Sequence, residues 1–414
     1  MTEIEIIGKK SKLASKKLIN LGNKKNLALK NIADNLIANY DKTITSNMLD
    51  LESGKISGLS NSFLDRLALD KSRIEAIVKS IYKIIAMEDP IGKIVSGHIT
   101  KDGLEIKKVT VPLGVIGLIY ESRPNVTVDA ACLCLKAGNS IILRGGKEAI
   151  NTNSCLVEII RDSIKSAGLP EDSVQLIKDT SRKSALELMS LNKYLDVLIP
   201  RGSAKLIKSV TENSRVPVIK TGSGNCHIYV DKFANIDTAV NIIFNAKTSR
   251  PSVCNAVETV LIHKDIATKA LPKIKDKLQT KNVELIGCHK TIKVLGNKVI
   301  PATDLDWSTE YLDYKLAIKV VENFSDAINH ISLYSTGHSE CIITSDYNRA
   351  IRFTSLVDSA AVYVNASTRF TDGGKFGLGA EIGISTQKLH ARGPMGINEL
   401  TSYKFIITGD GQIR

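Results

Sequence analysis

A cysteine in the segment SRPSVCNAVET, residues 249–259, stands in surroundings that suit nucleophilic chemistry. Cys254 follows Arg250 by four positions and precedes a run typical of a β-strand. A thiol attacks a carbonyl carbon as its thiolate, and a nearby cation or oriented backbone N–H groups lower the thiol pKa and populate that form. Cys254 is therefore a candidate nucleophile, with a cysteine that only fills the core as the alternative.

A second candidate stands where an apolar run, VIGLIY, meets the next predicted helix. Asn125 lies in the turn Ser122-Arg123-Pro124-Asn125. Its side-chain amide can donate a hydrogen bond to a developing oxyanion. An asparagine before Val-Thr also suits a helix N-cap, and the residues alone leave both interpretations open.

The sequence lacks two common nucleotide-binding patterns. In GLGAEIG, residues 377–383, the third glycine comes one position too late for G-x-G-x-x-G, and no segment matches GxxxxGK[ST]. A dinucleotide can still bind a parallel sheet without that turn.

Cys132 and Cys134 form a C-x-C pair, but no histidine or second cysteine pair follows at zinc-ligand spacing. We therefore expect no metal site and two buried thiols.

The composition is that of a soluble globular protein with one or two sizeable cores. The chain has 414 residues, of which 43% are hydrophobic and 24% charged. No apolar run approaches the roughly 18–20 residues that span a bilayer, and the start carries no apolar export segment. Seven cysteines, an odd number, favour a reducing compartment. We expect a cytoplasmic protein without a membrane partner.

The net charge of +13, from 56 basic and 43 acidic residues, raises the question of an anionic partner. The lysines are scattered along the chain, and no aromatic RNA-binding signature accompanies them. A compositional bias with solvated lysines explains most of the charge, and phosphorylated small molecules are the next interpretation. We expect no nucleic-acid partner.

Apolar spacing predicts a helical start followed by alternating strands and helices. Residues 1–90 repeat apolar positions at helical spacing, and the stretch around Asp102-Gly103 alternates as a hairpin does. Apolar strands then alternate with helices: VIGLIY, SIILRGG, VQLI, DVLIP, VPVI and HIYV, and a second set begins near Asp231. Fully apolar strands in such an alternation predict an α/β fold with parallel sheets and helices on both faces.

Seven motifs in order carry a resemblance to a known family: IYESRPNVTVDAA, ILRGGKEA, PRGSAKLI, TGSGNCHIYVD, SRPSVCNAVET, NASTRFTDGGKFGLGAEIGIS and LHARGPMG. Together they resemble the γ-glutamyl phosphate reductases, also called glutamate-5-semialdehyde dehydrogenases, of the aldehyde dehydrogenase superfamily. The resemblance covers roughly residues 1–410.

The resemblance implies an aldehyde dehydrogenase-like fold of two interleaved Rossmann-like α/β domains and a small β oligomerisation element. It places an NADP-binding domain at 1–97 with 112–226 and 358–398, and a catalytic domain with the nucleophilic cysteine at 227–357. Strands at 98–111 and 399–414 form the oligomerisation element. Because these strands lack partners in either α/β set, we expect them to pair in a homodimer or homotetramer.

The family reduces L-glutamyl 5-phosphate to glutamate 5-semialdehyde with NADPH and releases phosphate, the second step of proline biosynthesis. By this resemblance Cys254 is the nucleophile that forms a thioester, and Asn125 with the Cys254 backbone N–H forms the oxyanion hole. A CoA-acylating aldehyde dehydrogenase of the same superfamily is the alternative. The implied partners are the substrate, phosphate and the glutamate 5-kinase that supplies the substrate.

The resemblance also implies the binding residues. For NADP these are Arg144 and Lys147, whose two cations suit a 2′-phosphate, Glu310 for the nicotinamide ribose, and Arg201 with Gly202 near the pyrophosphate. Substrate anions are assigned to basic side chains, namely Arg123, Arg250, His338 and Arg369. Hydrolytic relatives carry a glutamate base where this chain has Thr221-Gly222, which fits a thioester that is reduced rather than hydrolysed. Lys220 replaces a common glutamate, and nothing in the sequence explains that exchange.

Overall fold

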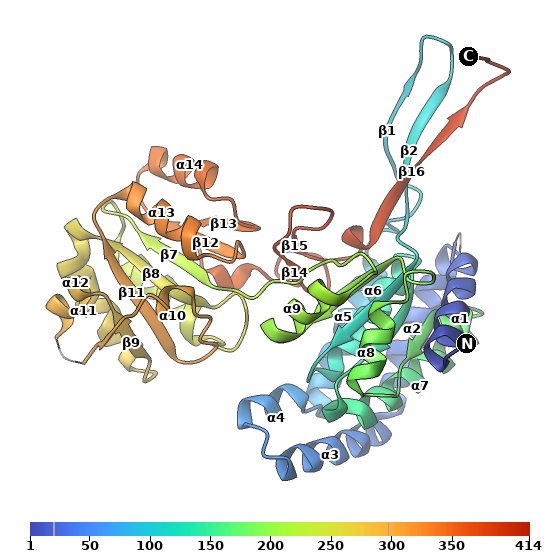
Figure 1. The fold of residues 1–414 in the computed structure, drawn as a ribbon, viewed down its shortest axis with the longest axis horizontal. Coiled ribbons are helices and arrows are strands. Elements are labelled where there is room, and N and C mark those ends of the chain that lie inside the picture. Colours follow the sequence, from blue (N-terminus) through green and yellow to red (C-terminus); the bar gives the residue numbers. More distant parts are fainter. Residues whose placement is uncertain (20, 297) are drawn as a thin grey trace. The chain divides into compact units, whose positions relative to one another are not determined.

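The computed structural model describes residues 1–19, 21–296 and 298–414, which fall into two compact units (Figure 1). The first unit comprises Met1–Thr221, Gly377–Gly383 and Pro394–Arg414, and the second comprises Gly222–Phe376 and Ile384–Gly393. The segments 222–226, 358–376 and 384–393, expected in the cofactor domain, thus lie in the second unit. Within the described ranges, no helix is long and apolar enough to cross a membrane.

The first unit begins with helices, as the apolar spacing predicts. They are α1 (Glu3–Lys17), α2 (Asn23–Ala38), α3 (Tyr40–Ile56), α4 (Asn61–Leu67) and α5 (Lys71–Ala86). Local sequence sets their starts: Thr2 forms a capping box with Glu5, and the Asp70 carboxylate accepts a hydrogen bond from the Arg73 backbone N–H at 2.7 Å. Buried apolar side chains on one side of each helix, such as Leu29 and Ile74, supply the packing.

A parallel four-stranded sheet forms the centre of the first unit, in the order β5 (Val174–Leu176), β4 (Ser140–Arg144), β3 (Val115–Tyr120) and β6 (Val197–Arg201). The helices between and after these strands are α6 (Pro124–Lys136), α7 (Ile150–Ser166), α8 (Arg182–Met189) and α9 (Ala204–Asn213), with short 3-10 turns η1 (Lys147–Ala149) and η2 (Glu171–Ser173). One face of the sheet buries apolar side chains of α1, α8 and α9. Cys132 and Cys134 are fully buried in α6, as expected.

The hairpin expected around Asp102-Gly103 is present and has a third strand beside it. β1 (Ile94–Ile99) pairs antiparallel with β2 (Glu105–Pro112), and β2 also pairs with β16 (Thr401–Thr408), near the end of the chain. Gly103 adopts φ +83°, a conformation that favours glycine in this turn. Every residue of β1 is exposed. Figure 1 shows the three strands as a long arm bearing the C-terminus.

The second unit holds a seven-stranded sheet whose paired strands run parallel. Its order is β10 (Ile300–Pro301), β9 (Glu284–Gly287), β11 (Lys315–Val321), β8 (Val257–His263), β7 (Cys226–Val230), β12 (Ser339–Ile343) and β13 (Ala361–Val364). One face packs on α10 (Ile236–Thr248), α11 (Lys264–Gln279) and α12 (His289–Leu295). The other packs on α13 (Phe324–Tyr334) and α14 (Tyr347–Leu356). The predicted α/β fold with helices on both faces is confirmed.

One predicted strand is wrong. VPVI, residues 216–219, forms only an isolated bridge between Val218 and Leu198. Pro217 has no backbone N–H to contribute to a ladder, which explains why the segment follows the sheet without joining it. The remaining regular structure is short: β14 (Ile384–Ser385) and β15 (Gly393–Pro394) pair, and 3-10 turns occur at η3 (Asp306–Ser308), η4 (Thr368–Phe370) and η5 (Asn398–Leu400).

Candidate active site

Cys254 lies in a turn at the amino edge of the seven-stranded sheet, just before β8. Its side chain is half-buried, and of the seven cysteines, all within the described residues, only Cys254 and Cys288 are not fully buried. The apolar segment that follows Cys254 enters the sheet centre, so the turn is fixed at its carboxyl end. The structure therefore offers Cys254 as an accessible thiol on a well-supported loop.

The backbone of Gly224 passes directly against the Cys254 peptide. A Cβ atom on Gly224 would lie 1.4 Å from the Cys254 carbonyl oxygen, so only glycine fits there. The Cys226 thiol donates a hydrogen bond to the same carbonyl at 3.2 Å. Burial raises the pKa of Cys226 well above its usual value, which keeps this thiol protonated and able to donate. The Gly-rich segment TGSGN and the cysteine that follows it thus pack against the backbone of the nucleophile loop.

Glu310 contacts the same TGSGN segment through Gly224. Its carboxylate accepts a hydrogen bond from the Gly224 backbone N–H at 2.6 Å. Burial raises the pKa of Glu310, while the Gly224 hydrogen bond and the neighbouring His338 oppose the rise. Gly224 therefore touches both the Cys254 carbonyl and the Glu310 carboxylate, and it places the expected ribose-binding residue near the expected nucleophile. Sequence reasoning did not single out Gly224 or Cys226, although the TGSGN motif contains the first.

The four basic residues assigned to substrate anions have very different surroundings. Arg250 is exposed on the nucleophile loop, and Arg123 is half-buried in the first unit, immediately before α6. His338 is fully buried beside β12, where its Nδ1 contacts the Ser339 hydroxyl at 2.8 Å. The His338 side chain is therefore not exposed to an incoming anion in this structure. Arg369, in η4, donates hydrogen bonds to the side chains of Ser249 and Asn255 on the nucleophile loop.

Asn125 lies in the first unit, in the first turn of α6. Its Nδ2 donates a hydrogen bond to an Asp129 carboxylate oxygen at 3.0 Å, one helical turn along. An amide nitrogen carries two hydrogens, so this bond orients the group and leaves the second hydrogen as a donor. Burial raises the pKa of Asp129 to about 6, and the nearby Glu381 adds to the rise. Asn125 does not cap its helix through its side chain in this structure.

Four of the five expected cofactor residues lie at or just after the carboxyl ends of β4 and β6, and the fifth, Glu310, lies in the second unit. Strand order reverses between β3 and β6, and in parallel sheets ligands bind at such a switch point. Arg201 ends β6, with its Nη2 3.9 Å from a Glu381 oxygen, and Gly202 is exposed. Arg144 ends β4, and its Nη2 donates to the carbonyls of Thr180 and Ser181 at 2.6 and 2.8 Å.

Two carboxylates at this edge were not anticipated from the sequence. Glu121 accepts a hydrogen bond from the Ser203 backbone N–H at 2.8 Å, and Glu148 accepts one from the Ser122 N–H at 2.8 Å. A Cβ on Gly202 would lie 2.5 Å from the Glu121 carboxylate, so a larger residue there would displace that side chain. These bonds hold together the turns that follow β3, β4 and β6. Ordinary polar residues in loops gave no signal of this role.

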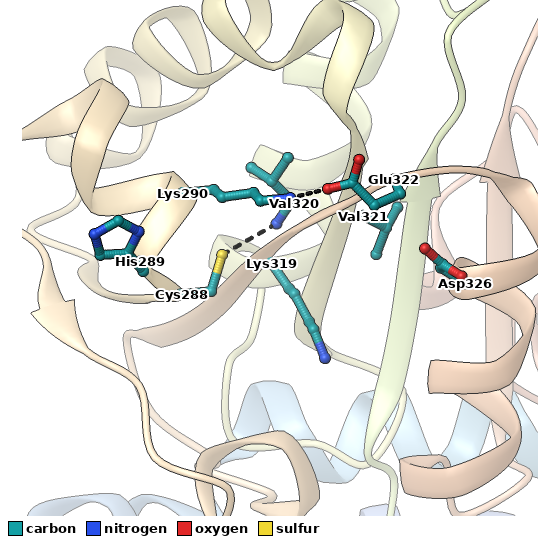
Figure 2. A pocket seen from close by; sticks show the side chains of 8 residues that line it. All are labelled: Cys288, His289, Lys290, Lys319, Val320, Val321, Glu322 and Asp326. Carbon is teal, nitrogen blue, oxygen red and sulfur yellow. Dashed lines mark hydrogen bonds and ion pairs between the residues drawn. The ribbon is translucent and has the colours of Figure 1, made fainter.

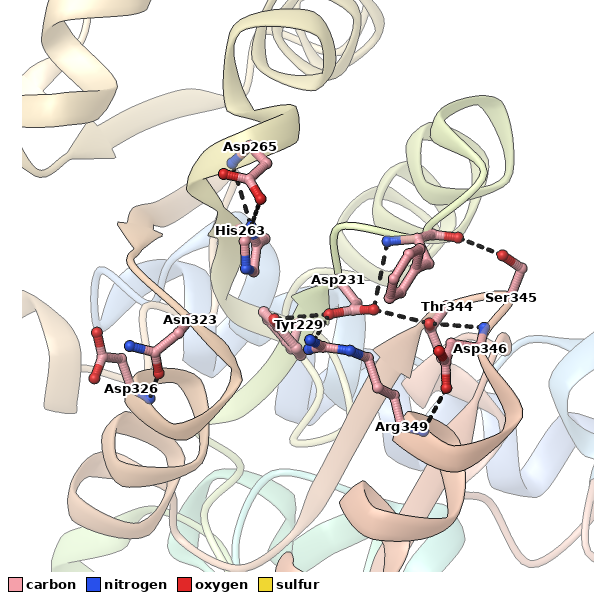
Figure 3. Close-up of polar contacts among 11 residues, drawn as sticks. Tyr229, Asp231, His263, Asp265, Asn323, Asp326, Thr344, Ser345, Asp346 and Arg349 are labelled. Atoms are coloured by element: carbon pink, nitrogen blue, oxygen red, sulfur yellow. Dashed lines mark hydrogen bonds and ion pairs between the residues drawn. The ribbon is translucent and has the colours of Figure 1, made fainter.

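The opposite, carboxyl edge of the second sheet carries a polar network of a structural kind (Figure 3). The buried Asp231 accepts hydrogen bonds from the Tyr229 hydroxyl at 3.0 Å, the Thr344 hydroxyl at 3.0 Å and Arg349 Nη1 at 2.8 Å. Burial raises the pKa of Tyr229, and Asp231 adds to the rise. Protein donors thus satisfy the buried carboxylate, and the network ties β7 and β12 to α14.

A cavity of about 420 Å³ lies at the same carboxyl edge and contains the other half-buried thiol (Figure 2). Its lining residues are Cys288, His289, Lys290, Lys319, Val320, Val321, Glu322 and Asp326. Cys288 Sγ accepts a hydrogen bond from the Val320 backbone N–H at 3.4 Å and also lies 3.4 Å from the Thr291 hydroxyl oxygen. Burial opposes these bonds, but their combined effect lowers the pKa of Cys288. This pocket is distinct from the loop of Cys254.

Comparison with known proteins identifies relatives along the whole chain. A family model described as "Aldehyde dehydrogenase family" matches residues 67–287. The gamma-glutamyl phosphate reductase of Heliobacterium modesticaldum is 54% identical over 414 residues, covering 100% of this chain and 99% of that protein. The protein of the same name from Clostridium perfringens is 55% identical over 413 residues, covering 100% of this chain and 99% of that protein.

Solved structures agree with the fold at two levels of similarity. The crystal structure of gamma-glutamyl phosphate reductase from Thermotoga maritima matches with a TM-score of 0.97 and 49% identity, covering 100% of both chains. An acetylating aldehyde dehydrogenase from Geobacillus thermoglucosidasius matches with a TM-score of 0.71 at 16% identity, also over 100% of both chains. The second match reflects a shared fold only.

Proposed function

The chain belongs to the aldehyde dehydrogenase family and, within it, to the γ-glutamyl phosphate reductases, and we infer that it reduces L-glutamyl 5-phosphate to L-glutamate 5-semialdehyde with release of phosphate. This is a step of proline biosynthesis. The observation that carries the inference is identity of 54–55% with reductases along the full chain, together with a half-buried thiol on a loop anchored by neighbouring segments.

Cys254 is the proposed nucleophile. Its thiolate attacks the acyl phosphate carbonyl, phosphate leaves with the bonding electron pair, and a thioester remains on the sulfur. The Cys254 backbone N–H and the Asn125 amide are the proposed oxyanion donors. Each such donor is worth roughly 3–4 kcal/mol of transition-state stabilisation. Thr221 stands where hydrolytic relatives carry a glutamate base, so no carboxylate there activates water against the thioester.

The residues at the carboxyl edge of the four-stranded sheet suit a nicotinamide dinucleotide, which supplies the hydride that reduces the thioester when it is bound. The first residues of α9, with Lys205, are exposed beside the end of β6, and helix amino ends favour phosphate groups. Lys147 is exposed beyond β4, while Arg144 is anchored to two carbonyls. We propose that Lys147 and Arg144 select NADPH, that Arg201 and Gly202 lie along the pyrophosphate, and that Glu310 holds the nicotinamide ribose.

For the substrate we propose Arg123 and Arg250 as anion-binding residues, because neither guanidinium is fully buried. His338 stays in the proposed site as a buried neighbour of Glu310. Seven free cysteines suit a reducing compartment, and we propose the cytoplasm. The glutamate 5-kinase that makes the labile acyl phosphate is the proposed supplier.

The decisive experiment measures the reverse reaction, oxidation of glutamate 5-semialdehyde with NADP and phosphate. Replacing phosphate with CoA tests the CoA-acylating alternative, because only the true acceptor supports turnover. We expect turnover with phosphate alone and loss of activity in Cys254→Ser. Near-normal activity in a folded Cys254→Ser protein would exclude the thioester route, and turnover with CoA alone would exclude the reductase assignment.

A further inference from the structure

The loop that bears Cys254 is fastened to η4, a segment more than a hundred residues further along the chain. Arg369 Nε donates a hydrogen bond to the Ser249 hydroxyl at 2.9 Å, and Arg369 Nη1 donates to the Asn255 side-chain oxygen. Ser249 precedes the nucleophile and Asn255 follows it directly. One guanidinium therefore bonds to the loop on both sides of Cys254.

Further bonds hold Asn255 to the same segment. The Thr368 hydroxyl donates to the Asn255 carbonyl at 2.7 Å, and the Asn255 side-chain amide donates to the Thr371 carbonyl at 2.8 Å. Asn255 is 4% exposed, so these bonds replace contacts with water rather than compete with it. Both the oxygen and the nitrogen of the Asn255 side-chain amide are thus hydrogen-bonded, which gives the side chain one defined orientation. The peptide that joins Asn255 to Cys254 is held in place with it.

Arg369 interacts electrostatically with Arg250 and Cys254 on the nucleophile loop, with Asp372 after η4 and with Cys226 from β7. Cys226 also interacts with Cys254 and Glu310, and Glu310 interacts with His338. Burial lowers the pKa of Arg369, and Asp372, Cys254 and Cys226 oppose that shift. A guanidinium nevertheless remains protonated at neutral pH. Its interaction with Cys254 is reciprocal, since a cation that is stabilised by a thiolate also stabilises that thiolate.

We propose that Arg369 is a positioning residue for the nucleophile, which holds Ser249 and Asn255 on either side of Cys254 and keeps a positive charge beside the thiol. The proposal rests on the proposed function in that it takes Cys254 as the nucleophile. It replaces the expectation that Arg369 grips a substrate anion. A guanidinium whose Nε and Nη1 already bond within the protein is poorly suited to a two-pronged grip on phosphate or carboxylate.

The test measures the alkylation of Cys254 by iodoacetamide as a function of pH, because only the thiolate reacts. All variants are made in full-length protein carrying Cys288→Ser, since Cys288 is the other accessible thiol and has a lowered pKa. Arg369→Gln removes the charge, Arg369→Lys keeps it, and Ser249→Ala removes one bond of the clamp. Rates are measured from about pH 5 to about pH 9, around the range in which cysteines titrate.

We expect Arg369→Gln to move the midpoint of the rate profile up by about one pH unit, so that alkylation at neutral pH slows about tenfold. Arg369→Lys restores most of the shift, and Ser249→Ala leaves the midpoint near that of the parent. In the semialdehyde assay kcat falls in Arg369→Gln while the KM for phosphate changes little. An unchanged midpoint overturns the proposal, and an unchanged midpoint with a raised KM for phosphate would assign Arg369 to substrate binding instead.

A second variant tests the same charge in the opposite direction. Asp372 is exposed and interacts electrostatically with Arg369, so Asp372→Asn removes an anion without disturbing a core. We expect the alkylation midpoint to fall by a few tenths of a pH unit, and a rise would contradict the proposal. The alkylation profile needs no substrate. It therefore tests Arg369 even if Cys254→Ser keeps its turnover and the proposed function fails.

Discussion

Arg144 and Lys147 lie at the two ends of the turn that follows β4, yet their side chains have different surroundings. The Arg144 guanidinium is half-buried and donates to two backbone carbonyls, and the Lys147 ammonium is exposed. The half-buried Arg144 guanidinium fixes the turn and holds its positive charge there, whereas the exposed Lys147 ammonium is placed to contact an anion directly. The sequence pattern predicts both cations but not this division, because it depends on the carbonyls of Thr180 and Ser181 more than thirty residues away.

This division predicts a specific change in cofactor preference. Lys147→Ala should raise the KM for NADPH about tenfold and leave the KM for NADH nearly unchanged, because a charge-assisted contact to phosphate is worth roughly 1.5–3 kcal/mol. Steady-state kinetics with both cofactors measures the ratio. Lys208→Ala, further along α9 and 75% exposed, is the matched control for loss of a lysine outside the proposed cofactor site. Equal increases for NADPH and NADH would contradict a role in selecting the 2′-phosphate.

Asp129 gives a pH-dependent prediction of stability. Its folded-state pKa of about 6 lies above the ordinary value of 3.8, so folding favours the protonated acid. The stabilising contribution is therefore full below about pH 3.8 and is lost as the pH rises through about 6. Asp129→Asn keeps an acceptor for Asn125 and removes the charge. We expect it to stabilise the protein by up to roughly 3 kcal/mol above about pH 6 and by little near pH 4.

Urea unfolding of the two proteins at several pH values, followed by circular dichroism, measures this difference. The decisive quantity is the change in the free energy of unfolding between mildly acidic and neutral pH. A difference that stays constant with pH would mean that Asp129 does not titrate in this range. Loss of turnover without loss of stability in the same variant would instead point to the Asn125 contact as the sensitive feature.

At the scale of elements, the fold was far more predictable than the site. Apolar spacing correctly predicted the helical start, the parallel strands and the hairpin at Asp102-Gly103, since burial of one helix face or a whole strand leaves a local signature. VPVI was wrong because Pro217 removes a ladder donor that periodicity does not count. The bonds of Arg369 to Ser249 and Asn255 join distant loops, and no local spacing encodes such contacts.

A buried ion pair between α10 and β8 provides the prediction at this scale. Lys247 and Glu258 are both fully buried, with Nζ and Oε2 2.6 Å apart. Burial raises the pKa of Glu258 to about 7 and lowers that of Lys247, while each partner opposes the shift in the other. Glu258 also accepts a hydrogen bond from the Leu312 backbone N–H at 3.3 Å. The pair therefore depends on both members being present.

Lys247→Met should destabilise the second unit by roughly 3–5 kcal/mol, because it leaves a carboxylate buried without its partner. The double variant Lys247→Met with Glu258→Leu should recover much of this loss, since it removes both charges at similar volume. Thermal unfolding followed by the fluorescence of Trp307, the one tryptophan of the chain, reports on the unit that contains the pair. A single variant as stable as the parent would contradict the prediction and show that Glu258 is protonated or hydrated without Lys247.

At the scale of the whole molecule, the sheet of β1, β2 and β16 exposes more apolar side chains than is usual for a monomeric protein. Exposed apolar side chains occur along both outer strands, including Ile99, Tyr403, Phe405 and Ile407. Within the described residues, each outer strand pairs on one side only. Unpaired strand edges and apolar patches of this kind promote association. We therefore keep the prediction that this sheet joins copies of the chain.

Substitution of the outward apolar side chains of β16 tests that prediction without deleting the strand. Phe405 and Ile407 are 57% and 54% exposed and lie two residues apart, so they share a face. Aspartate at both positions should convert a dimer or tetramer into a monomer in sedimentation velocity at micromolar concentration, because it places charge where an apolar contact is expected. Leu333→Asp controls for adding an acidic residue elsewhere, since Leu333 lies in α13 and is 72% exposed. A parent protein that sediments as a monomer would contradict the prediction that the chain associates. A double variant that stays associated would place the contact surface outside these strands.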